Sequence, residues 1–310
     1  MKARPLDCLY PAAAACIWGS LYVVSKPALE ILPPFTFVLL RYVVALLVLL
    51  PLAVRLCRTQ GIRIAKEDIG TFLFVGIAGY GISTGTQFLG TKLSSASVAS
   101  LINAMNPVTI AVFAALLLRE RITRTQVAAL VVVIAGAAII LGDNLGSGQA
   151  AGILVSLVSV CLWSLMSVRV RRLGASYPPL LITTVALLIA GVCLIPVSAA
   201  EIWVSGGIQG WSWSLLPVVL YTGLICTALS QFCWNKGLTR LEASRCGMFY
   251  PLQPVVSTLL GVWILQEPVN ARFLIGGVLI VGGIIWNIRS DRPATNGGKE
   301  HDHHHCKTSH

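Results

Sequence analysis

Apolar residues run through most of the chain in long uncharged stretches, and short polar segments between them carry nearly all of the charge. A helix needs about 20 apolar residues to cross the hydrocarbon core of a bilayer. Lipid forces backbone polar groups to pair within each helix, so stretches of that length predict membrane-spanning helices. The pattern predicts ten spans, near residues 8–27, 34–54, 70–89, 95–117, 125–141, 150–170, 179–199, 214–234, 245–265 and 271–288.

The composition supports the same class of protein. Apolar residues make up 56% of the 310 residues, charged residues only 11%, and the mean hydropathy is +0.80. A soluble domain carries about 25% charged residues, so we expect an all-α polytopic membrane protein surrounded by the lipid bilayer. Little of the chain lies outside the spans. We therefore expect no soluble catalytic domain, no enzyme activity and no cofactor.

The net charge of +11 would suggest a nucleic-acid partner in a soluble protein. Its distribution indicates a membrane protein instead. If the N-terminus is cytoplasmic, nineteen of the 23 Lys and Arg residues fall in inside segments. The exceptions are Lys26, Lys92 and Arg272, which fall outside, and Arg41, which lies within a span. The positive-inside rule therefore predicts a cell (inner) membrane protein with both termini cytoplasmic and no nucleic-acid partner.

The pattern of polar and apolar positions occurs twice. The segment Ala96-Ser97-Val98-Ala99…Asn106-Pro107…Leu118-Arg119-Glu120 returns as Ala243-Ser244…Gln253-Pro254…Leu265-Gln266-Glu267, with matched residues 147 apart (243−96, 254−107 and 267−120). Five spans per copy is an odd number, so the second copy must be inverted relative to the first, as in many transporters. We expect a first repeat at 8–142, a second at 150–288, and a cytoplasmic, His-rich, disordered tail at 289–310.

Polar positions coincide when the two copies are superimposed. Spans four and nine each carry a polar pair before a proline: Asn103 and Asn106 before Pro107, and Tyr250 and Gln253 before Pro254. A proline inside a helix deprives the carbonyl four residues earlier of its hydrogen bond, and in a membrane that carbonyl needs a polar side chain, water or a substrate. The alternative is a packing kink whose amides bond neighbouring helices. We favour cavity lining, because polar groups inside a membrane are usually functional.

Two further pairs of spans give matched faces. In spans one and six, Trp18, Tyr22 and Lys26 share a face that Trp163, Ser167 and Arg171 repeat. In spans three and eight, the faces contain Tyr80, Thr84 and Gln87, and then Tyr221, Thr227 and Gln231. We expect the side chains of Lys26 and Arg171, at the ends of these faces, to snorkel to the lipid headgroups. The substrate-binding residues predicted from all these faces are Trp18, Tyr22, Tyr80, Gln87, Asn103, Asn106, Trp163, Ser167, Gln231, Tyr250 and Gln253.

Acidic side chains and histidines are missing from the middle of every predicted span. Proton-coupled carriers and carriers of organic cations usually need such a group in the membrane. We therefore expect a neutral cavity, suited to a zwitterion or an uncharged molecule. For Arg41, about two turns into span two, the alternatives are snorkelling, an ion pair with Glu30, and a contact with a substrate carboxylate. Glu120 and Glu267 end their helices near arginines and are interpreted as structural ion pairs.

Cysteine and histidine usage gives little sign of metal chemistry. The nine cysteines have no CxxC spacing and predict neither a disulfide framework nor a zinc site. All five histidines lie in the last ten residues, where such a tract can bind metal. We favour a disordered polar tail and expect no metal site. A metal sensor acting through the tail would lose its response when residues 291–310 are deleted, whereas a carrier would keep its transport.

These motifs together resemble the EamA family of the drug/metabolite transporter superfamily, in a ten-span form with two EamA domains. The residues that carry the resemblance are Trp18-Gly19-Ser20, Arg41, Ser95 to Ala99, Asn106-Pro107, Leu118 to Glu120, Glu242 to Ser244, Gln253-Pro254 and Leu265 to Glu267. The resemblance implies a basket-like bundle in the inner membrane with a central cavity between the halves. The second half departs from the usual motif at Ser164 and Gln266, where the family normally has glycine.

We therefore expect a secondary transporter that exports a small neutral or zwitterionic metabolite, such as an amino acid, by alternating access. The resemblance supplies the export direction and the amino acids. The alternative within the same superfamily is a facilitator for sugars or nucleotide-sugars, although phosphorylated substrates would need cations in the cavity. A metal-responsive membrane sensor ranks lower. The expected partners are a small-molecule substrate and the lipid bilayer.

Overall fold

The computed structural model describes residues 5–103, 105–118, 124–144, 149–174, 176–208, 212–240, 249–250, 252–266 and 270–290. Within these ranges the chain is helical and contains no strand. In chain order the elements are η1 (Pro5–Cys8), α1 (Leu9–Ile31), α2 (Pro34–Gln60), η2 (Lys66–Asp68), α3 (Ile69–Phe74), η3 (Val75–Ser83), α4 (Thr84–Leu93), α5 (Ala96–Asn103), α6 (Asn106–Leu118), α7 (Arg124–Asn144), α8 (Ala150–Leu173), α9 (Pro179–Val204), α10 (Leu215–Leu220), η4 (Tyr221–Leu229), α11 (Ser230–Arg240), α13 (Leu252–Leu265) and α14 (Ala271–Ser290).

The predicted all-α, polytopic fold is confirmed. Six helical stretches of the described chain are long and apolar enough to cross a membrane: Leu9–Ile31, Pro34–Gln60, Lys66–Leu93, Ala150–Val170, Pro179–Val204 and Leu215–Trp234. These stretches are predicted spans one, two, three, six, seven and eight. Predicted spans four, five, nine and ten correspond to α5 with α6, α7, α13 and α14.

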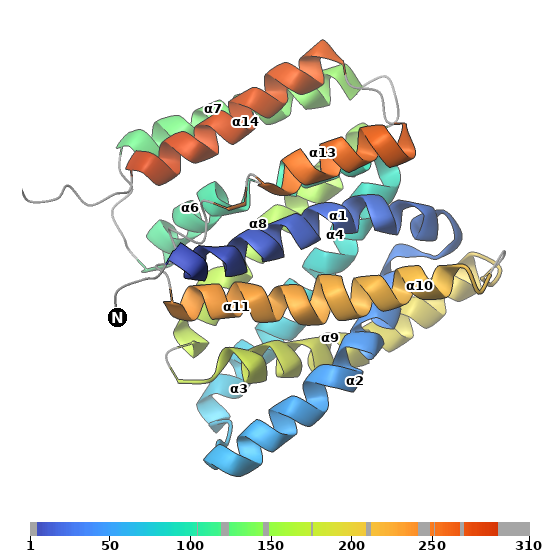
Figure 1. Cartoon of the computed structure of the whole chain (residues 1–310), viewed down its shortest axis with the longest axis vertical. Coiled ribbons are helices and arrows are strands. Elements are labelled where there is room, and N and C mark those ends of the chain that lie inside the picture. Colours follow the sequence, from blue (N-terminus) through green and yellow to red (C-terminus); the bar gives the residue numbers. More distant parts are fainter. Residues whose placement is uncertain are drawn as a thin grey trace, which may run out of the picture.

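The helix contacts follow a two-fold symmetry: a contact between two helices recurs between their counterparts in the other repeat. α1 packs against α13, and its counterpart α8 packs against α6. In the same way α4 packs against α8, and α11 against α1. Counterparts also pair with each other: α7 packs against α14 at the top of the view in Figure 1, and α2 packs against α9 toward its lower end. The arrangement is the 5+5 inverted repeat predicted from the sequence.

Spans two and seven begin in the same way. α2 starts after Pro33 and α9 after Pro178, and in each helix a second proline occupies the first helical position. Proline suits that position because its fixed φ matches the helix and its missing N–H has no partner there anyway. Pro33 has no side-chain oxygen to cap α2. Glu201 of α9 does this instead, accepting from the Thr36 N–H at 2.8 Å and the Phe35 N–H at 3.3 Å.

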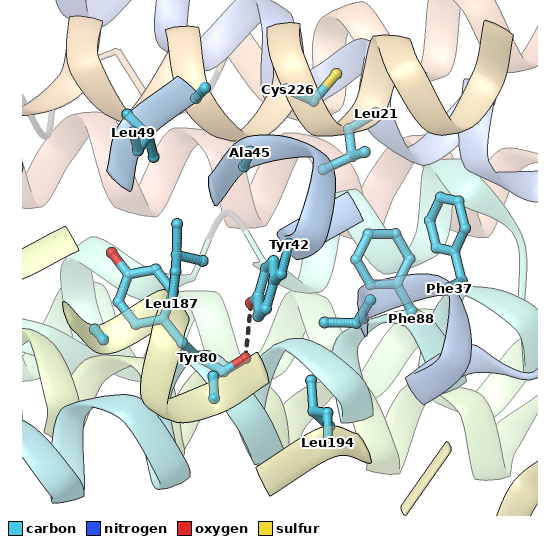
Figure 2. Close-up of a cluster of buried hydrophobic side chains, with 14 of the residues drawn as sticks. Leu21, Phe37, Tyr42, Ala45, Leu49, Tyr80, Phe88, Leu187, Leu194 and Cys226 are labelled. Atoms are coloured by element: carbon cyan, nitrogen blue, oxygen red, sulfur yellow. Dashed lines mark hydrogen bonds between the residues drawn. The ribbon is translucent and has the colours of Figure 1, made fainter. Parts of the chain in front are cut away.

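Spans three and eight are locally widened at equivalent places. η3 and η4 are π-helical segments of nine residues each. Such segments are rare, and they often mark functional sites because the wider turn redirects side chains and frees backbone carbonyls. In η4 the Thr227 hydroxyl donates to the carbonyl of Thr222, five residues earlier, at 2.8 Å. In η3 the carbonyl of Tyr80 accepts from the Tyr42 hydroxyl at 2.7 Å, the dashed line in Figure 2.

One large apolar core joins the two repeats. It brings Phe37 and Tyr42 of α2 together with Phe88 of α4 and Leu187 of α9 (Figure 2). The outward faces are apolar as well, since Leu47 of α2 is 71% exposed. In water such a surface would be costly, but in a bilayer it contacts lipid tails. The fold therefore keeps its polar side chains for the interior, between the repeats.

Candidate functional site

A cavity lined by both repeats lies inside the bundle. The empty space between its lining atoms, counted together with the part that opens to solvent, is about 550 Å³. Spans one, two, three, four, six, eight and nine contribute to its wall. The lining residues are Trp18, Leu21, Tyr22, Arg41, Tyr42, Tyr80, Thr84, Gln87, Asn103, Asn106, Trp163, Thr227, Gln231, Tyr250 and Gln253. Aromatic rings and uncharged amides dominate this list, a combination typical of sites for small organic molecules.

Span four is interrupted beside the cavity, and the described part of span nine begins with a turn at the equivalent place. α5 ends at Asn103 and α6 begins at Asn106, whereas α13 begins just after a turn at Phe249 and Tyr250. The same tight turn occurs in both copies: the Met105 N–H donates to the Ile102 carbonyl at 3.1 Å, and the Leu252 N–H donates to the Phe249 carbonyl at 3.0 Å. Interrupted helices at a repeat interface are the usual construction of a transporter binding site.

The carbonyls that the two prolines deprive of helical partners are satisfied locally. The Asn106 side chain donates from Nδ2 to the Asn103 carbonyl at 2.7 Å and to Asn103 Oδ1 at 2.9 Å. The Tyr250 carbonyl accepts from the Gln253 N–H at 3.0 Å. In both places the carbonyl that the proline leaves without a helical partner is satisfied, and an amide side chain still reaches the cavity.

The amides of the two interruptions meet across the repeat interface. Asn103 Nδ2 lies 3.4 Å from Gln253 Oε1, a long hydrogen bond that joins spans four and nine. The Ser164 hydroxyl of span six donates to Asn106 Oδ1 at 3.3 Å and bonds the Thr109 hydroxyl at 2.5 Å. These contacts hold the amides in place, so their remaining donors and acceptors face the cavity in a fixed geometry.

Aromatic rings form two walls of the cavity. On one side Trp18 lies 6.4 Å from Tyr250, and both pack on Trp234, with ring centroids 5.3 and 4.9 Å away. On the other side Tyr80 lies 5.7 Å from Trp163. The Gln87 side chain donates from Nε2 to the Tyr22 hydroxyl at 2.7 Å, which fixes a further polar group in the wall.

Gly19 allows span one to approach the interruption of span nine. A Cβ built at this position would lie 2.8 Å from the Gln253 carbonyl oxygen and 2.8 Å from Val256 Cβ. The equivalent position in span six is Ser164, which lies beside Asn106, the equivalent of Gln253. The departure from the usual glycine at Ser164 therefore replaces a close backbone approach with a hydrogen bond.

Arg41 lies in the cavity wall, which argues against two of the three alternatives that the sequence left open for it and against the expected neutral cavity. Its side chain is only 4% exposed and does not snorkel. It donates from Nε and Nη2 to the Thr227 hydroxyl at 2.9 and 2.6 Å, and Glu30 is exposed and is not its partner. The cavity is therefore not neutral, because a guanidinium stays protonated in proteins. The sequence misled because the direction in which Arg41 points depends on η4, far along the chain.

The chain matches the EamA-like transporter family twice, over residues 7–142 and again over residues 150–289. It belongs to the EamA-like transporter family. The family that its motifs resemble is thereby confirmed. This EamA-like transporter is a multi-pass membrane protein whose family points to a small-molecule substrate.

Relatives of this EamA-like transporter span nearly the whole chain. An uncharacterized transporter of Archaeoglobus fulgidus is 26% identical over 90% of this chain and 97% of its own length. The uncharacterized transporter YetK of Bacillus subtilis is 26% identical over 88% of this chain and 84% of its own. A probable biotin transporter of Pseudomonas aeruginosa is 29% identical over 80% of this chain and 85% of its own. A solved structure covers 94% of this chain and 99% of its own with a TM-score of 0.65 at 22% identity, a likeness of fold alone.

Ten of the eleven residues predicted to bind substrate in this EamA-like transporter lie in the cavity wall. The structure does not bring Ser167 to the wall; its hydroxyl donates to the Trp163 carbonyl at 2.8 Å, within its own helix. The wall also contains Leu21, Arg41, Tyr42, Thr84 and Thr227. The matched faces of spans three and eight already contained the two threonines. Nothing in the sequence singled out Leu21 or Tyr42, which look like ordinary core residues until α2 is placed.

Lys26 does not snorkel either. Its Nζ donates to the carbonyls of Thr91 at 2.7 Å and Lys92 at 3.3 Å, and to that of Ser94, so it caps the end of α4. Cations stabilise a helix C-terminus because they complement its partial negative charge. The predictions for the Arg171 side chain, for Glu120 and Glu267, and for the tail at 291–310 fall outside the described residues.

Proposed function

We propose that this EamA-like transporter exports a small organic metabolite, neutral overall or zwitterionic, such as an amino acid, by alternating access. The observation that carries the proposal is that matched turns, one in each repeat, present neighbouring amide side chains to a single cavity. In this mechanism the repeats at 8–142 and 150–288 rock against each other, and the cavity between them opens to one side of the membrane at a time.

The cavity wall suggests how such a molecule would be held. The side chains of Asn103, Asn106 and Gln253 supply donors and acceptors for the polar groups of a substrate. Trp18 and Trp163 supply flat apolar surfaces for the rest of it. No carboxylate is among the described lining residues, so an organic cation would lack a counter-charge.

The orientation proposed is that of an inner-membrane protein with both termini in the cytoplasm. It rests on the excess of Lys and Arg in the segments that this orientation places inside. The Pseudomonas relative named as a probable biotin transporter makes biotin a useful probe. Nucleotide-sugars fit less well, because their phosphates carry several negative charges and Arg41 is the one cation in the described wall.

Flux into proteoliposomes tests the function. Purified protein is reconstituted, and uptake of labelled amino acids, neutral metabolites, biotin and sugars is measured with and without a pH gradient. We expect saturable flux of at least one probe, reduced about tenfold or more by Asn106→Ala or Gln253→Ala. Each variant removes a buried amide and leaves its partners unsatisfied, at a cost of roughly 1–3 kcal/mol.

Trp263→Ala is the matched control. Trp263 lies on the same helix as Gln253 but is 76% exposed, on the lipid-facing side, so its variant should transport normally. Flux that is insensitive to both amide variants would contradict the proposed site. Flux that requires a pH gradient would show proton coupling, with Glu120 and Glu267 the first residues to replace.

A further inference from the structure

We propose that Arg41 binds a carboxylate of the transported molecule. The inference rests on the proposed transport through this cavity. It narrows the substrates to molecules with a carboxylate, and it extends them from zwitterions to singly charged organic anions, in place of uncharged molecules such as sugars. It comes from a buried cation that the described part of the protein leaves without a counter-charge.

The bonds that hold Arg41 all go to uncharged groups. Nε and Nη2 donate to the Thr227 hydroxyl, and Nη2 also lies 3.5 Å from the Cys226 carbonyl. The guanidinium carbon is 5.0 Å from the centre of the Phe88 ring, a cation–π contact. These contacts fix the position of the guanidinium, but none of them neutralises it.

One nitrogen of the guanidinium remains available. Nη1 has no hydrogen-bond partner among the described residues. Nη1 is nevertheless not fully enclosed. In the described part of the chain, the fully enclosed side-chain atoms that lack a hydrogen-bond partner are the hydroxyls of Ser156 and Ser198. Nη1 is therefore open to the cavity that Arg41 lines, and it can donate to a molecule that enters.

The surroundings make an anion the natural occupant. A buried charge is costly in a low-dielectric interior unless an opposite charge pairs with it. The described wall contains no carboxylate. Glu201, the acidic residue of the neighbouring α9, is already used to cap α2. A substrate that brings its own negative charge would supply the missing partner.

A carboxylate matches this cation better than a phosphate does. A single guanidinium balances one negative charge and forms short, directional hydrogen bonds with a carboxylate. A phosphate monoester carries about −1.5 to −2 at neutral pH, which would leave charge unpaired inside the membrane. The aromatic lining residues Tyr22, Tyr42 and Trp18 would then surround the less polar body of the same molecule.

Matched pairs of a carboxylate and its carboxamide test the inference, because they differ in charge and hardly in shape. The probes are indole-3-acetate with indole-3-acetamide, and N-acetyl-leucine with its amide. Each is assayed for stabilising the full-length protein against thermal unfolding in detergent and for flux in proteoliposomes. We expect the wild-type protein to prefer the carboxylate by about ten- to hundredfold, the range for a hydrogen bond to a charged group.

Variants at two arginines of the same helix separate the site from general charge effects. Arg41→Gln should remove the preference, and Arg41→Lys should retain part of it because the cation remains. Arg58→Gln is the control, since Arg58 is exposed in the last turn of α2. Arg41→Lys also keeps the experiment decisive if Arg41→Gln fails to fold.

The two readouts distinguish the two proposals. The uncharged probes could be transported as fast as their carboxylate partners, with no change in Arg41→Lys. That result would overturn the carboxylate site and leave transport standing. Stabilisation by carboxylates that depends on Arg41, without flux of any probe, would keep the carboxylate site and overturn transport.

Discussion

Single residues at matched positions of the two repeats serve different purposes around the cavity. Gly19 lets a helix backbone touch the Gln253 carbonyl, whereas its counterpart Ser164 bonds the Asn106 side chain. The duplication pointed to these positions because identical spacing in two copies is improbable without a shared structural role. It did not reveal that the first repeat makes a close backbone contact at this position and the second a side-chain hydrogen bond, because each depends on the helix that packs against it.

Replacing Gly19 tests the close approach at this scale. In Gly19→Ala the new methyl group would lie 2.8 Å from a carbonyl oxygen. We expect a loss of about 1–3 kcal/mol of stability, as for other overpacked interiors, together with reduced flux because Gln253 is displaced. Gly282→Ala is the comparison, because nothing lies within 4 Å of a Cβ at that position. Equal thermal stability of the two variants would mean that the contact at Gly19 is not tight.

At the scale of elements, the features that build the site are the irregular ones. Span four breaks beside the cavity, the described part of span nine begins there with a matching turn, and spans three and eight widen there. The matched prolines pointed to both places because they predicted carbonyls without helical partners there, and the loss of an N–H is a property of the residue itself. The widened turns were not predicted, because a π-helical segment is defined by backbone hydrogen bonds between residues i and i+5 in place of i and i+4, and the sequence does not show backbone hydrogen bonds.

The start of α2 depends on a helix far along the chain, and this can be measured. Glu201 of α9 accepts from two backbone amides of α2 and from the Thr36 hydroxyl at 3.0 Å. We expect Glu201→Ala to lower the free energy of unfolding by about 0.5–2 kcal/mol, the usual effect of losing a helix cap. Thermal unfolding in detergent is the measurement, with Glu30→Ala as the control because Glu30 is exposed near the end of α1. A Glu201→Ala variant as stable as the control would show that the cap contributes nothing.

At the scale of the whole molecule, two inverted repeats pack against each other through pairs of equivalent helix contacts. The cavity lies between the repeats. Spans four and nine cross where the hydroxyls of Ser100 and Ser257 meet. If the repeats rock against each other, this crossing joins parts that move relative to one another. Its position beside the two interruptions makes it a suitable place to stop the motion.

A reversible crosslink at the crossing tests alternating access. In the double variant Ser100→Cys with Ser257→Cys, oxidation should join the repeats and abolish flux, and a reductant should restore it. Each single variant should keep its flux under oxidation. Mass spectrometry measures the crosslinked fraction. Full flux from crosslinked protein would show that spans four and nine do not separate during transport.

The sequence by itself determined the class of protein, the number of spans, the inverted repeat, the family and most residues of the cavity wall. It could do so because lipid makes long apolar stretches helical, and because a duplication marks matched positions without any knowledge of contacts. The tertiary structure decided how the charges are used. Arg41, Lys26 and Glu201 each have partners distant in sequence, so only the packing of the helices shows that the first faces the cavity and the other two cap helix ends.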